Sequence, residues 1–271
     1  MQQLHKPVGT MLKITYITVT YNAAQTIPAT IGSVLTQSYT EIEHIIVDGK
    51  SADDTIRIAS EYKEKTSKSG SNHIVRIISE QDKGIYDAMN KGIKMATGDY
   101  ICFLNAGDWL PDSNTTQEIA DAINNATKGS TMPAVVYGDT DIVDEQGNHL
   151  CRRTKRPPVV LNWQSFKDGM TVCHQAFYAR TDIAQQTPFN MRYKYSADFD
   201  WCIRIMKHAE EHSLSLINTD RVLVNYLNEG TTTRNRIASL KERYRIMQKY
   251  YGIWATAFSH IKFLAKKSSF C

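Results

Sequence analysis

The chain has 271 residues, of which 42% are hydrophobic and 22% are charged. This length and composition allow one large α/β domain or two small ones with a sizeable core, and they exclude a disordered or fibrous protein. The five cysteines lack the C-x-x-C or Cys/His spacing of a zinc site.

The formal net charge of +4 is unevenly distributed along the chain. Residues 234–271 contain nine Lys or Arg and a single acid, Glu242, so this tail carries +8 and residues 1–233 carry −4. The amino-terminal stretch has no apolar core typical of a secretion signal, and no later stretch reaches the ~18 apolar residues of a membrane-spanning helix. We therefore expect a cytoplasmic protein, either free or peripheral at the inner face of the cell membrane.

Apolar runs alternate with helical patterns in the first half of the chain. Strands are predicted over 14–19, 43–47, 74–79 and 100–104, and helices over 26–38, 51–65, 84–98 and 111–126. Thr26 and Pro28 suit the start of the first helix, and Gly98 suits the end of the third. Such alternation is typical of βαβ units with a parallel sheet.

The pattern changes after Pro133. Residues 134–143 and 148–154 flank "DEQG" and predict an antiparallel hairpin. A strand is predicted over 170–179, a helix over 198–211 and a last strand over 216–227. Because no long linker separates the halves, we expect one fold with halves of about 11–130 and 131–233.

The basic tail, 234–271, has apolar residues at alternating spacings of three and four. This pattern predicts an amphipathic helix, or two helices broken at Gly252. Its apolar face either packs on the protein's own body or on a second subunit, or lies on an anionic membrane surface. No motif in the chain indicates nucleic-acid binding. The residues of the apolar stripe are Ile237, Leu240, Tyr244, Met247, Tyr251, Trp254, Phe258 and Ile261.

Polar residues follow each of the first four predicted strands. They occur at Thr20 to Asn22, Asp48 and Gly49, Glu80 to Gly84, and Asn105 to Asp108. Ligands of parallel sheets bind beyond the carboxyl ends of the strands, so several carboxylates are expected on one rim. Acids next to glycine suit a divalent cation that neutralises a diphosphate, although Asp48 or Asp108 taken alone better fits a cap of the helix that follows.

Several longer motifs resemble family 2 glycosyltransferases, the inverting enzymes with the GT-A fold. They are "TVTYNAAQTI", "IIVDGKSADDT", "SEQDKGIYDAMNKGIKMATGDYICFLNAGD", "MTVCHQAFYAR" and "SADFDW". The likeness is greatest to bacterial members that build exopolysaccharide, capsule or O-antigen chains. It implies a Rossmann-like α/β fold with a mixed, mainly parallel sheet over 1–233 and a helical extension.

The resemblance also implies roles for individual residues. Tyr21 and Asn22 would line a nucleotide pocket, and Asp48 would accept a hydrogen bond from the base, typically uracil. Asp82 and Lys83 would border the sugar nucleotide, with Asn90 and Lys91 beside them, and His174 would lie at the acceptor site or near the diphosphate. Asp198 would be the catalytic base. Each has a simpler alternative: Asp198, like Ser196, is a good helix cap, and His174 suits a half-buried strand.

The chain departs from the family at its D-x-D motif. Asn105 and Gly107 stand where acids are expected, and Asp108, one step further, is the remaining acid. The resemblance therefore implies Mn²⁺ or Mg²⁺ held by Asp108 with help from Asn105. The implied activity is that of a hexosyltransferase moving a sugar from a nucleotide diphosphate, most often UDP, to a lipid-linked bacterial glycan. The alternative is a carbohydrate- or nucleotide-binding protein without catalysis.

Overall fold

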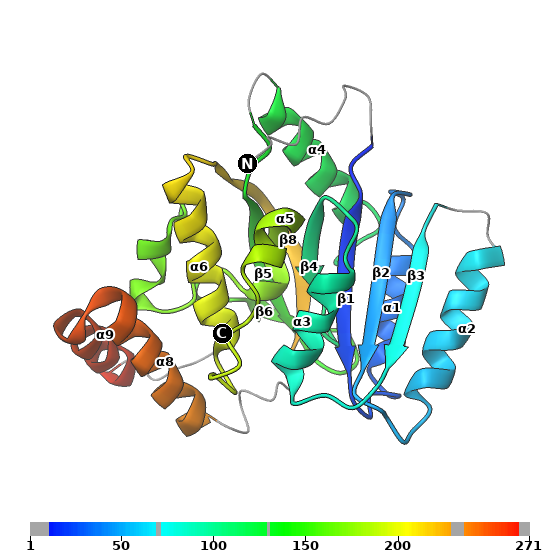
Figure 1. Ribbon diagram of the computed structural model, residues 1–271, viewed down its shortest axis with the longest axis horizontal. Helices are drawn as coiled ribbons and strands as arrows, with labels where there is room; N and C mark the ends of the chain where they lie inside the picture. Colours follow the sequence, from blue (N-terminus) through cyan, green and yellow to red (C-terminus); the bar gives the residue numbers. More distant parts are fainter. Residues whose placement is uncertain (1–10, 69–71, 129–130, 229–235, 266–271) are drawn as a thin grey trace.

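The computed structural model describes residues 11–68, 72–128, 131–228 and 236–265. A single mixed sheet crosses the molecule (Figure 1), and its described strands follow the order β3-β2-β1-β4-β7-β5-β6, with β8 paired to β5. The pairs among β1, β2, β3 and β4 are parallel, whereas β7 runs antiparallel to β4 and β5. The predicted mixed, mainly parallel α/β sheet is confirmed.

The strands agree closely with the sequence pattern. The predicted hairpin is confirmed, because β5 and β6 pair antiparallel, and the predicted bounds of β3 and β8 are those observed. The strands are β1 (Ile14–Thr20), β2 (Ile42–Asp48), β3 (Ile74–Ser79), β4 (Tyr100–Phe103), β5 (Val135–Val143), β6 (His149–Arg152), β7 (Phe177–Arg180) and β8 (Leu216–Leu227).

The helices cover both faces of the sheet. Alternate residues of β1 enter different core clusters: Ile17 packs with residues of α3, α5 and α6, whereas Tyr16 packs with residues of α4. A parallel sheet needs this two-sided cover, because its strands are apolar on both faces. The helices are α1 (Ile27–Leu35), α2 (Thr55–Lys68), α3 (Ile85–Met95), α4 (Thr115–Thr127), α5 (Thr181–Gln186), α6 (Ala197–Glu211), α8 (Arg236–Tyr251) and α9 (Ile253–Ala265), with 3₁₀ turns η1 (Trp163–Asp168) and η2 (His174–Ala176).

The basic tail forms α8 and α9, so the second of the two alternatives, two helices broken at Gly252, is the one observed. Gly252 has φ 82°, which suits glycine because a Cβ disfavours this conformation. Ile246 and Met247 of α8 are buried in the same cluster as Trp201 of α6. Part of the apolar stripe therefore packs on the protein's own body, at the end of the molecule away from α2 and β3 (Figure 1).

Two local predictions are wrong. Residues 170–179 do not form one strand, because β7 begins only at Phe177 and His174–Ala176 form η2. This turn carries His174 and Gln175 out of the sheet toward the loop after β4. Helix α3 ends at Met95 instead of at Gly98, whose added Cβ would lie 2.7 Å from the backbone oxygen of Lys13. Gly98 is thus needed for close chain packing.

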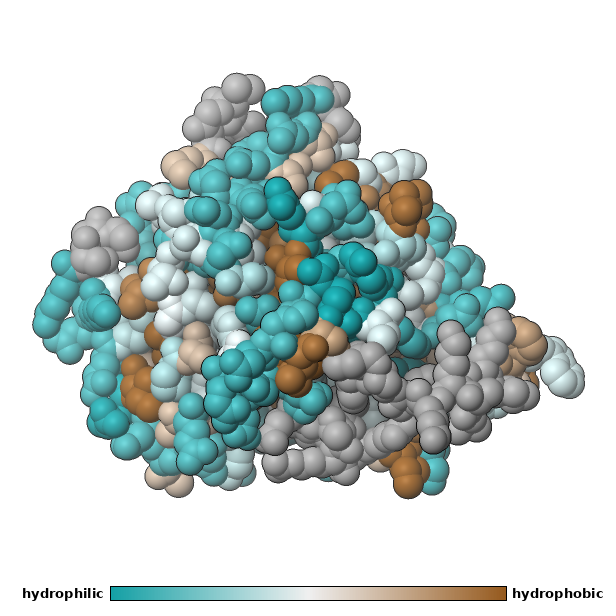
Figure 2. Space-filling model, turned by 180° about the vertical axis from the view of Figure 1, so that it is seen from behind, coloured by the Kyte–Doolittle hydropathy of each residue, from teal (hydrophilic) through white to brown (hydrophobic). Residues whose placement is uncertain are grey.

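None of the described helices is long and apolar enough to cross a membrane. On the face shown in Figure 2, hydrophobic side chains form separate small patches among hydrophilic ones. Such scattered exposure of hydrophobic side chains is normal at a protein surface.

Candidate active site

The carboxyl ends of β1, β2 and β3 are joined by one buried carboxylate. Asp48 at the end of β2 accepts hydrogen bonds from Thr20 Oγ1 (3.0 Å), Ser79 Oγ (2.7 Å) and Ser51 N (2.9 Å), and also from the Ser51 hydroxyl. Burial raises the pKa of Asp48, but these hydrogen bonds outweigh it and hold the pKa below its usual value. Both oxygens are engaged within the protein, so Asp48 shapes the rim here, and its contact with a base stays a prediction.

An open rim lies above Asp48. The side chain of Tyr21 is exposed, and Asn22 adopts φ 48° with its amide oxygen accepting from Ala52 N at 2.9 Å. A Cβ added at Gly49 would lie 2.6 Å from Asp82 Oδ2 and 3.3 Å from a ring carbon of Tyr21. The structure thus brings Tyr21 and Asp82 together around a glycine, where a larger side chain would collide with Asp82.

The predicted residues on α3 mainly hold chain segments in place. Asn90 accepts from Phe189 N at 2.7 Å and donates to Phe189 O at 3.1 Å, and Lys91 donates to Gln81 O at 3.0 Å. Lys83 is exposed, and its backbone N–H donates to Asp87. Of these residues, only the Lys83 side chain is presented to solvent beside the rim.

Asp108 points into the protein. Its Oδ2 accepts from Gln175 Nε2 at 2.9 Å and its Oδ1 from Leu227 N at 3.1 Å. Burial raises the pKa of Asp108 to about 6, although these two hydrogen bonds oppose the shift. The side chain therefore ties the loop after β4 to η2 and to the end of β8, and it does not cap the helix that follows.

The described residues do not fit the predicted metal site. Both carboxylate oxygens of Asp108 are engaged by protein donors, and no group of three His, Cys, Asp or Glu side chains suited to a metal ion occurs among the described residues. Asn105 keeps one buried amide oxygen without a hydrogen-bond partner. A single neutral oxygen is a weak ligand set for a hard cation. We therefore derive no step through a metal.

His174 and Asp198 lie side by side. His174 Nδ1 is 3.3 Å from Asp198 Oδ2, and Tyr86 on α3 donates its hydroxyl hydrogen to Asp198 Oδ1 at 2.9 Å. The other ring nitrogen of His174, Nε2, lies 3.3 Å from Asn105 Nδ2. Nδ1 of His174 is placed to donate a hydrogen bond to Asp198 Oδ2. The turn η2 and the helices α3 and α6 thus converge on one carboxylate.

Asp198 is held in its charged form. Burial raises the pKa of Asp198, but the hydrogen bond and charge of His174, the charge of Arg243 and the Tyr86 hydroxyl together lower it below its usual value. Asp198 lies in the first turn of α6, where the helix dipole also favours a negative charge. Its oxygens face Tyr86 and His174, which excludes the simpler role of a helix cap.

Asp200, the neighbouring acid, has a different environment. It is fully buried and bound by Arg204 Nε at 2.7 Å, by the Tyr250 hydroxyl at 2.8 Å and by Lys249 at 3.4 Å. These partners join α6 to α8 and leave no oxygen facing the rim. Asp198 instead contacts Tyr86 and His174, and its role as the base stays a prediction.

The tail supports the helix that carries Asp198. Glu242 on α8 accepts backbone hydrogen bonds from Lys194 N (2.8 Å), Tyr195 N (2.7 Å) and Ser196 N (3.0 Å), directly before α6 begins. These are backbone donors that the helix itself does not use. Glu242 therefore fixes the start of α6, two residues before Asp198.

Four residues of this site were missed by the sequence reasoning: Tyr86, Gln175, Glu242 and Arg243. Gln175 is adjacent to the noted His174, and Glu242 was visible as the tail's single acid. Nothing in the sequence pattern around Tyr86 or Arg243 indicated that either residue belongs to the site.

Comparison with solved structures identifies the fold. The chain superposes on the crystal structure of S. aureus TarS 1-349 in complex with UDP-GlcNAc with a TM-score of 0.68 and 18% sequence identity, covering 95% of this chain and 68% of that one. The α/β sheet and its covering helices are thus a GT-A fold.

Sequence comparison identifies the family. The model of "Glycosyl transferase family 2" matches residues 15–186, more than half of the chain, and the chain belongs to this family. It is 33% identical over 193 residues to the "PGL/p-HBAD biosynthesis glycosyltransferase" of Mycobacterium bovis (strain BCG / Pasteur 1173P2), covering 68% of this chain and 66% of the relative. The match thus spans just under two thirds of that relative's length. The chain is also 25% identical over 236 residues to the "UDP-Glc:alpha-D-GlcNAc-diphosphoundecaprenol beta-1,3-glucosyltransferase WfgD" of Escherichia coli. This match covers 86% of this chain and 85% of the relative.

Proposed function

We propose that the protein is an inverting glycosyltransferase that moves a sugar from a nucleotide diphosphate to a growing bacterial surface glycan. The observation that carries this proposal is the ionised Asp198, whose two oxygens contact Tyr86 and His174. Inversion requires a base that takes the proton of the acceptor hydroxyl, while the anomeric carbon is attacked from the face opposite the nucleotide. Asp198 is the base in this proposal.

The remaining residues act by orientation. The Tyr86 hydroxyl and His174 Nδ1 each contact one oxygen of Asp198, which limits its rotation. A nucleotide diphosphate is a good leaving group once its charge is balanced, so no covalent nucleophile is needed. Positioning and electrostatic stabilisation then supply most of the acceleration.

We propose UDP as the nucleotide and a lipid-linked diphosphate as the acceptor. The names of two similar proteins support this choice, since the S. aureus structure contains UDP-GlcNAc and the Escherichia coli relative is named for UDP-Glc and a diphosphoundecaprenol acceptor. In keeping with such an acceptor, we propose that the tail contacts the inner face of the cell membrane.

The deciding experiment is a thermal-shift titration with UDP, GDP and dTDP, each with and without Mn²⁺. A nucleotide at ~100 times its dissociation constant adds about 2.7 kcal/mol to the free energy of unfolding, which is easily measured. Stabilisation by UDP supports the proposed donor, and the Mn²⁺ arm shows whether a metal contributes to its binding.

A second assay separates catalysis from binding alone. Hydrolysis of a UDP-sugar by the purified protein, lost in Asp198→Asn, supports the enzyme. Nucleotide binding without hydrolysis or transfer would favour the alternative, a binding protein without catalysis.

A further inference from the structure

Four exposed cations gather where the loop before α6 meets α8. The loop, residues 189–195, is joined to α8 because the carboxylate of Glu242 accepts from Lys194 N at 2.8 Å. Two of the cations lie in this loop, and the other two lie on α8, at the residue before Glu242 and one turn later. Together they form what we call the basic surface, which consists of Arg192, Lys194, Lys241 and Arg245.

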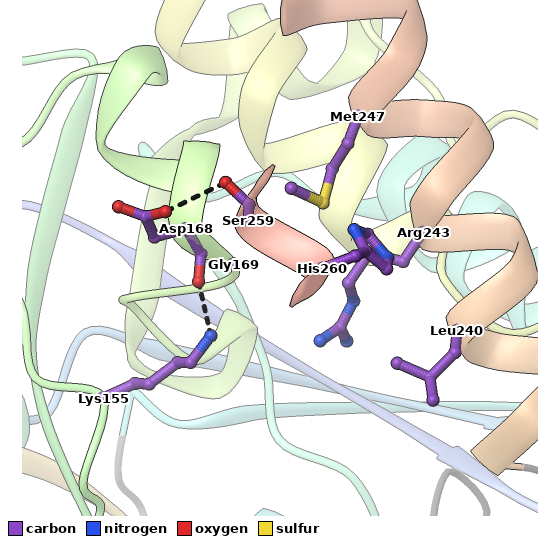
Figure 3. Close-up of a pocket in the computed structure, with 8 residues that line it drawn as sticks. All are labelled: Lys155, Asp168, Gly169, Leu240, Arg243, Met247, Ser259 and His260. Carbon is purple, nitrogen blue, oxygen red and sulfur yellow. Dashed lines mark hydrogen bonds between the residues drawn. The ribbon is translucent and has the colours of Figure 1, made fainter. Parts of the chain in front are cut away.

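Helix α8 has one covered face and one open face. Leu240, Arg243 and Met247 point toward η1 and α9 (Figure 3). Lys241 and Arg245 are four residues apart, which places them on the same side of the helix, and both are exposed. The covered face thus fixes α8 on the body of the protein and leaves a basic row open to solvent.

The charges of the basic surface are not neutralised within the protein. None of its four cations forms an ion pair with a residue in the described ranges of the chain. The single acid of the loop and α8 is Glu242, whose carboxylate is already bound by three backbone N–H groups. Lys194 Nζ lies 5.6 Å from the centre of the Tyr195 ring, a contact that adds no opposite charge. The surface therefore attracts anions.

Exposed apolar side chains flank the cations. Met191, directly before Arg192, is 46% exposed, and Ile237, one turn before Lys241, is 72% exposed. Beyond the end of α8, Ile253 at the start of α9 is also exposed. Basic residues interspersed with exposed apolar ones are typical of protein surfaces that lie on anionic bilayers.

The exposure of these cations favours an extended partner. A single small anion would be held only by solvated side chains, whereas a bilayer presents many anionic headgroups at once. Each basic residue near such a bilayer strengthens binding by about fivefold. The phosphate backbone of a nucleic acid is also anionic, but it offers no apolar layer to side chains such as Met191 and Ile237.

We propose that the basic surface docks the protein on an anionic lipid bilayer. This inference extends the membrane contact proposed for the tail to the loop before α6, and it rests on the proposed function only for its use in catalysis. A bilayer on this surface lies next to the contact of Glu242 with Ser196 N, directly before α6. A lipid-linked acceptor would then reach the enzyme from this side.

The first test is sedimentation of the whole protein with vesicles of phosphatidylglycerol and, separately, of phosphatidylcholine. Two double variants each remove two charges: Lys241→Gln with Arg245→Gln, and Arg192→Gln with Lys194→Gln. We expect each pair to lose at least tenfold in affinity for phosphatidylglycerol and to match wild type on phosphatidylcholine. Because salt screens this attraction, added salt should weaken binding of wild type more than binding of either pair.

The matched control is Lys63→Gln with Lys65→Gln on α2. Both lysines are exposed, neither forms an ion pair within the described part of the chain, and α2 lies at the opposite end of the molecule from α8 (Figure 1). This pair changes the net charge equally and should bind vesicles like wild type. The same loss of affinity in the control as in the two test pairs, or no loss in any pair, would overturn the proposal.

The second test needs no substitution and is therefore independent of folding of the variants. Wild type is acetylated at its lysines with and without phosphatidylglycerol vesicles. We expect vesicles to protect Lys194 and Lys241 and to leave Lys63 and Lys65 reactive. Unchanged reactivity of Lys194 and Lys241 in vesicle-bound protein would overturn the proposal. Protection without vesicles that increases with protein concentration would also overturn it, because a second copy of the chain would then cover the surface.

Titration with UDP separates this inference from the proposed function. Wild type and all three pairs should be stabilised equally by UDP, because none of the substituted residues is placed at the nucleotide rim. If UDP stabilises none of the proteins, the proposed donor is contradicted and the vesicle results stand. If UDP stabilises all of them but the test pairs bind vesicles like wild type, only the docking surface is overturned.

Discussion

Glu242 of α8 accepts the backbone N–H of Ser196, the residue directly before α6, with an oxygen to nitrogen distance of 3.0 Å. The same carboxylate also holds the two preceding N–H groups. The Ser196 hydroxyl in turn lies 3.0 Å from that of Ser239, also on α8. The tail and the start of the base-carrying helix are therefore one connected unit.

Replacing Glu242 with Ala should lower turnover more than donor binding. Loss of hydrogen bonds to a charged acceptor costs about 1.5–3 kcal/mol for each bond, and a base displaced by ~1 Å can lose ~100-fold in rate. We expect Glu242→Ala to reduce kcat at least tenfold, with the KM for the donor nearly unchanged and the protein still folded. Glu242→Gln, which keeps one acceptor oxygen, should recover part of the rate.

Glu210→Ala is the matched control for Glu242→Ala. Glu210 lies near the other end of α6 and accepts from Trp163 Nε1 at 2.7 Å, so its loss loosens packing away from the base. Melting temperature and kcat are measured for both variants. Equal losses of kcat at equal stability would show that Glu242 has only a general structural role.

Replacing Asp198 with Asn tests the base itself. The amide keeps the shape of the side chain and removes its ability to take a proton. A positioned base commonly contributes roughly 10²–10⁴-fold, so kcat should fall by that factor while the dissociation constant for UDP stays within about twofold. Asp200→Asn is a poor substitute for this test because Asp200 binds Arg204 and α8. Wild-type turnover in Asp198→Asn would remove the base assignment.

The local sequence pattern was sufficient to predict many of the strands and helices. Strands β1 to β3 are runs of apolar residues ended by polar ones, so their bounds and the rim at their carboxyl ends could be predicted. Gly252 marked one of the two alternatives for the tail, and its φ of 82° ends α8 in the structure. In these places a single residue or a short run determines the conformation.

Long-range contacts decided what the pattern missed. Residues 170–176 have strand-like composition, yet His174 and Gln175 leave the sheet to contact Asp198 and Asp108. Asp108 faces inward because its partners, Gln175 and Leu227, are 67 and 119 residues away in the sequence. The spacing of neighbouring residues does not encode such distant partners. For the same reason, Glu242 could be recognised as the single acid of the tail, but its contacts with the residues before α6 could not be predicted.

The acid limb of the pH profile should depend on His174. The hydrogen bond and charge of His174 help to lower the pKa of Asp198, so a carboxylate without this neighbour takes up a proton at higher pH. We expect the acid limb of kcat/KM in His174→Ala to move to higher pH than in wild type. His212→Ala, an exposed histidine at the end of α6, should leave the profile unchanged. An unmoved limb in His174→Ala would contradict this coupling.

Asp108 should make stability depend on pH in a defined direction. Its pKa is raised from 3.8 to about 6 by burial, so the folded chain binds this proton more tightly than the unfolded chain. The stabilisation is complete below about pH 4 and is lost as the pH rises through about 6, with a total of about 3 kcal/mol.

Comparison of wild type with Asp108→Asn isolates this effect from other titrating groups. The free energy of unfolding is measured by urea denaturation between pH 4 and pH 7.5. Relative to wild type, Asp108→Asn should gain stability as the pH rises through this range, because only wild type must ionise a buried carboxylate. A constant difference across the range would mean that Asp108 titrates normally.

The outer face of α9 should bind anionic membranes. Ile253, Trp254 and Phe258 are 61%, 89% and 61% exposed, while Thr256 and Ser259 of the same helix are buried. The tail also carries +8, which attracts anionic lipid, and an exposed apolar face with basic residues is typical of interfacial helices.

Trp254→Ser combined with Phe258→Ser should weaken binding to phosphatidylglycerol vesicles at least tenfold in a sedimentation assay and leave transfer to a soluble acceptor unchanged. Ile74→Ser, an exposed residue at the start of β3, is the control and should bind vesicles like wild type. If the double variant also binds like wild type, this face of α9 serves another contact, such as a second copy of the chain, which the oligomeric state of the two proteins would then reveal.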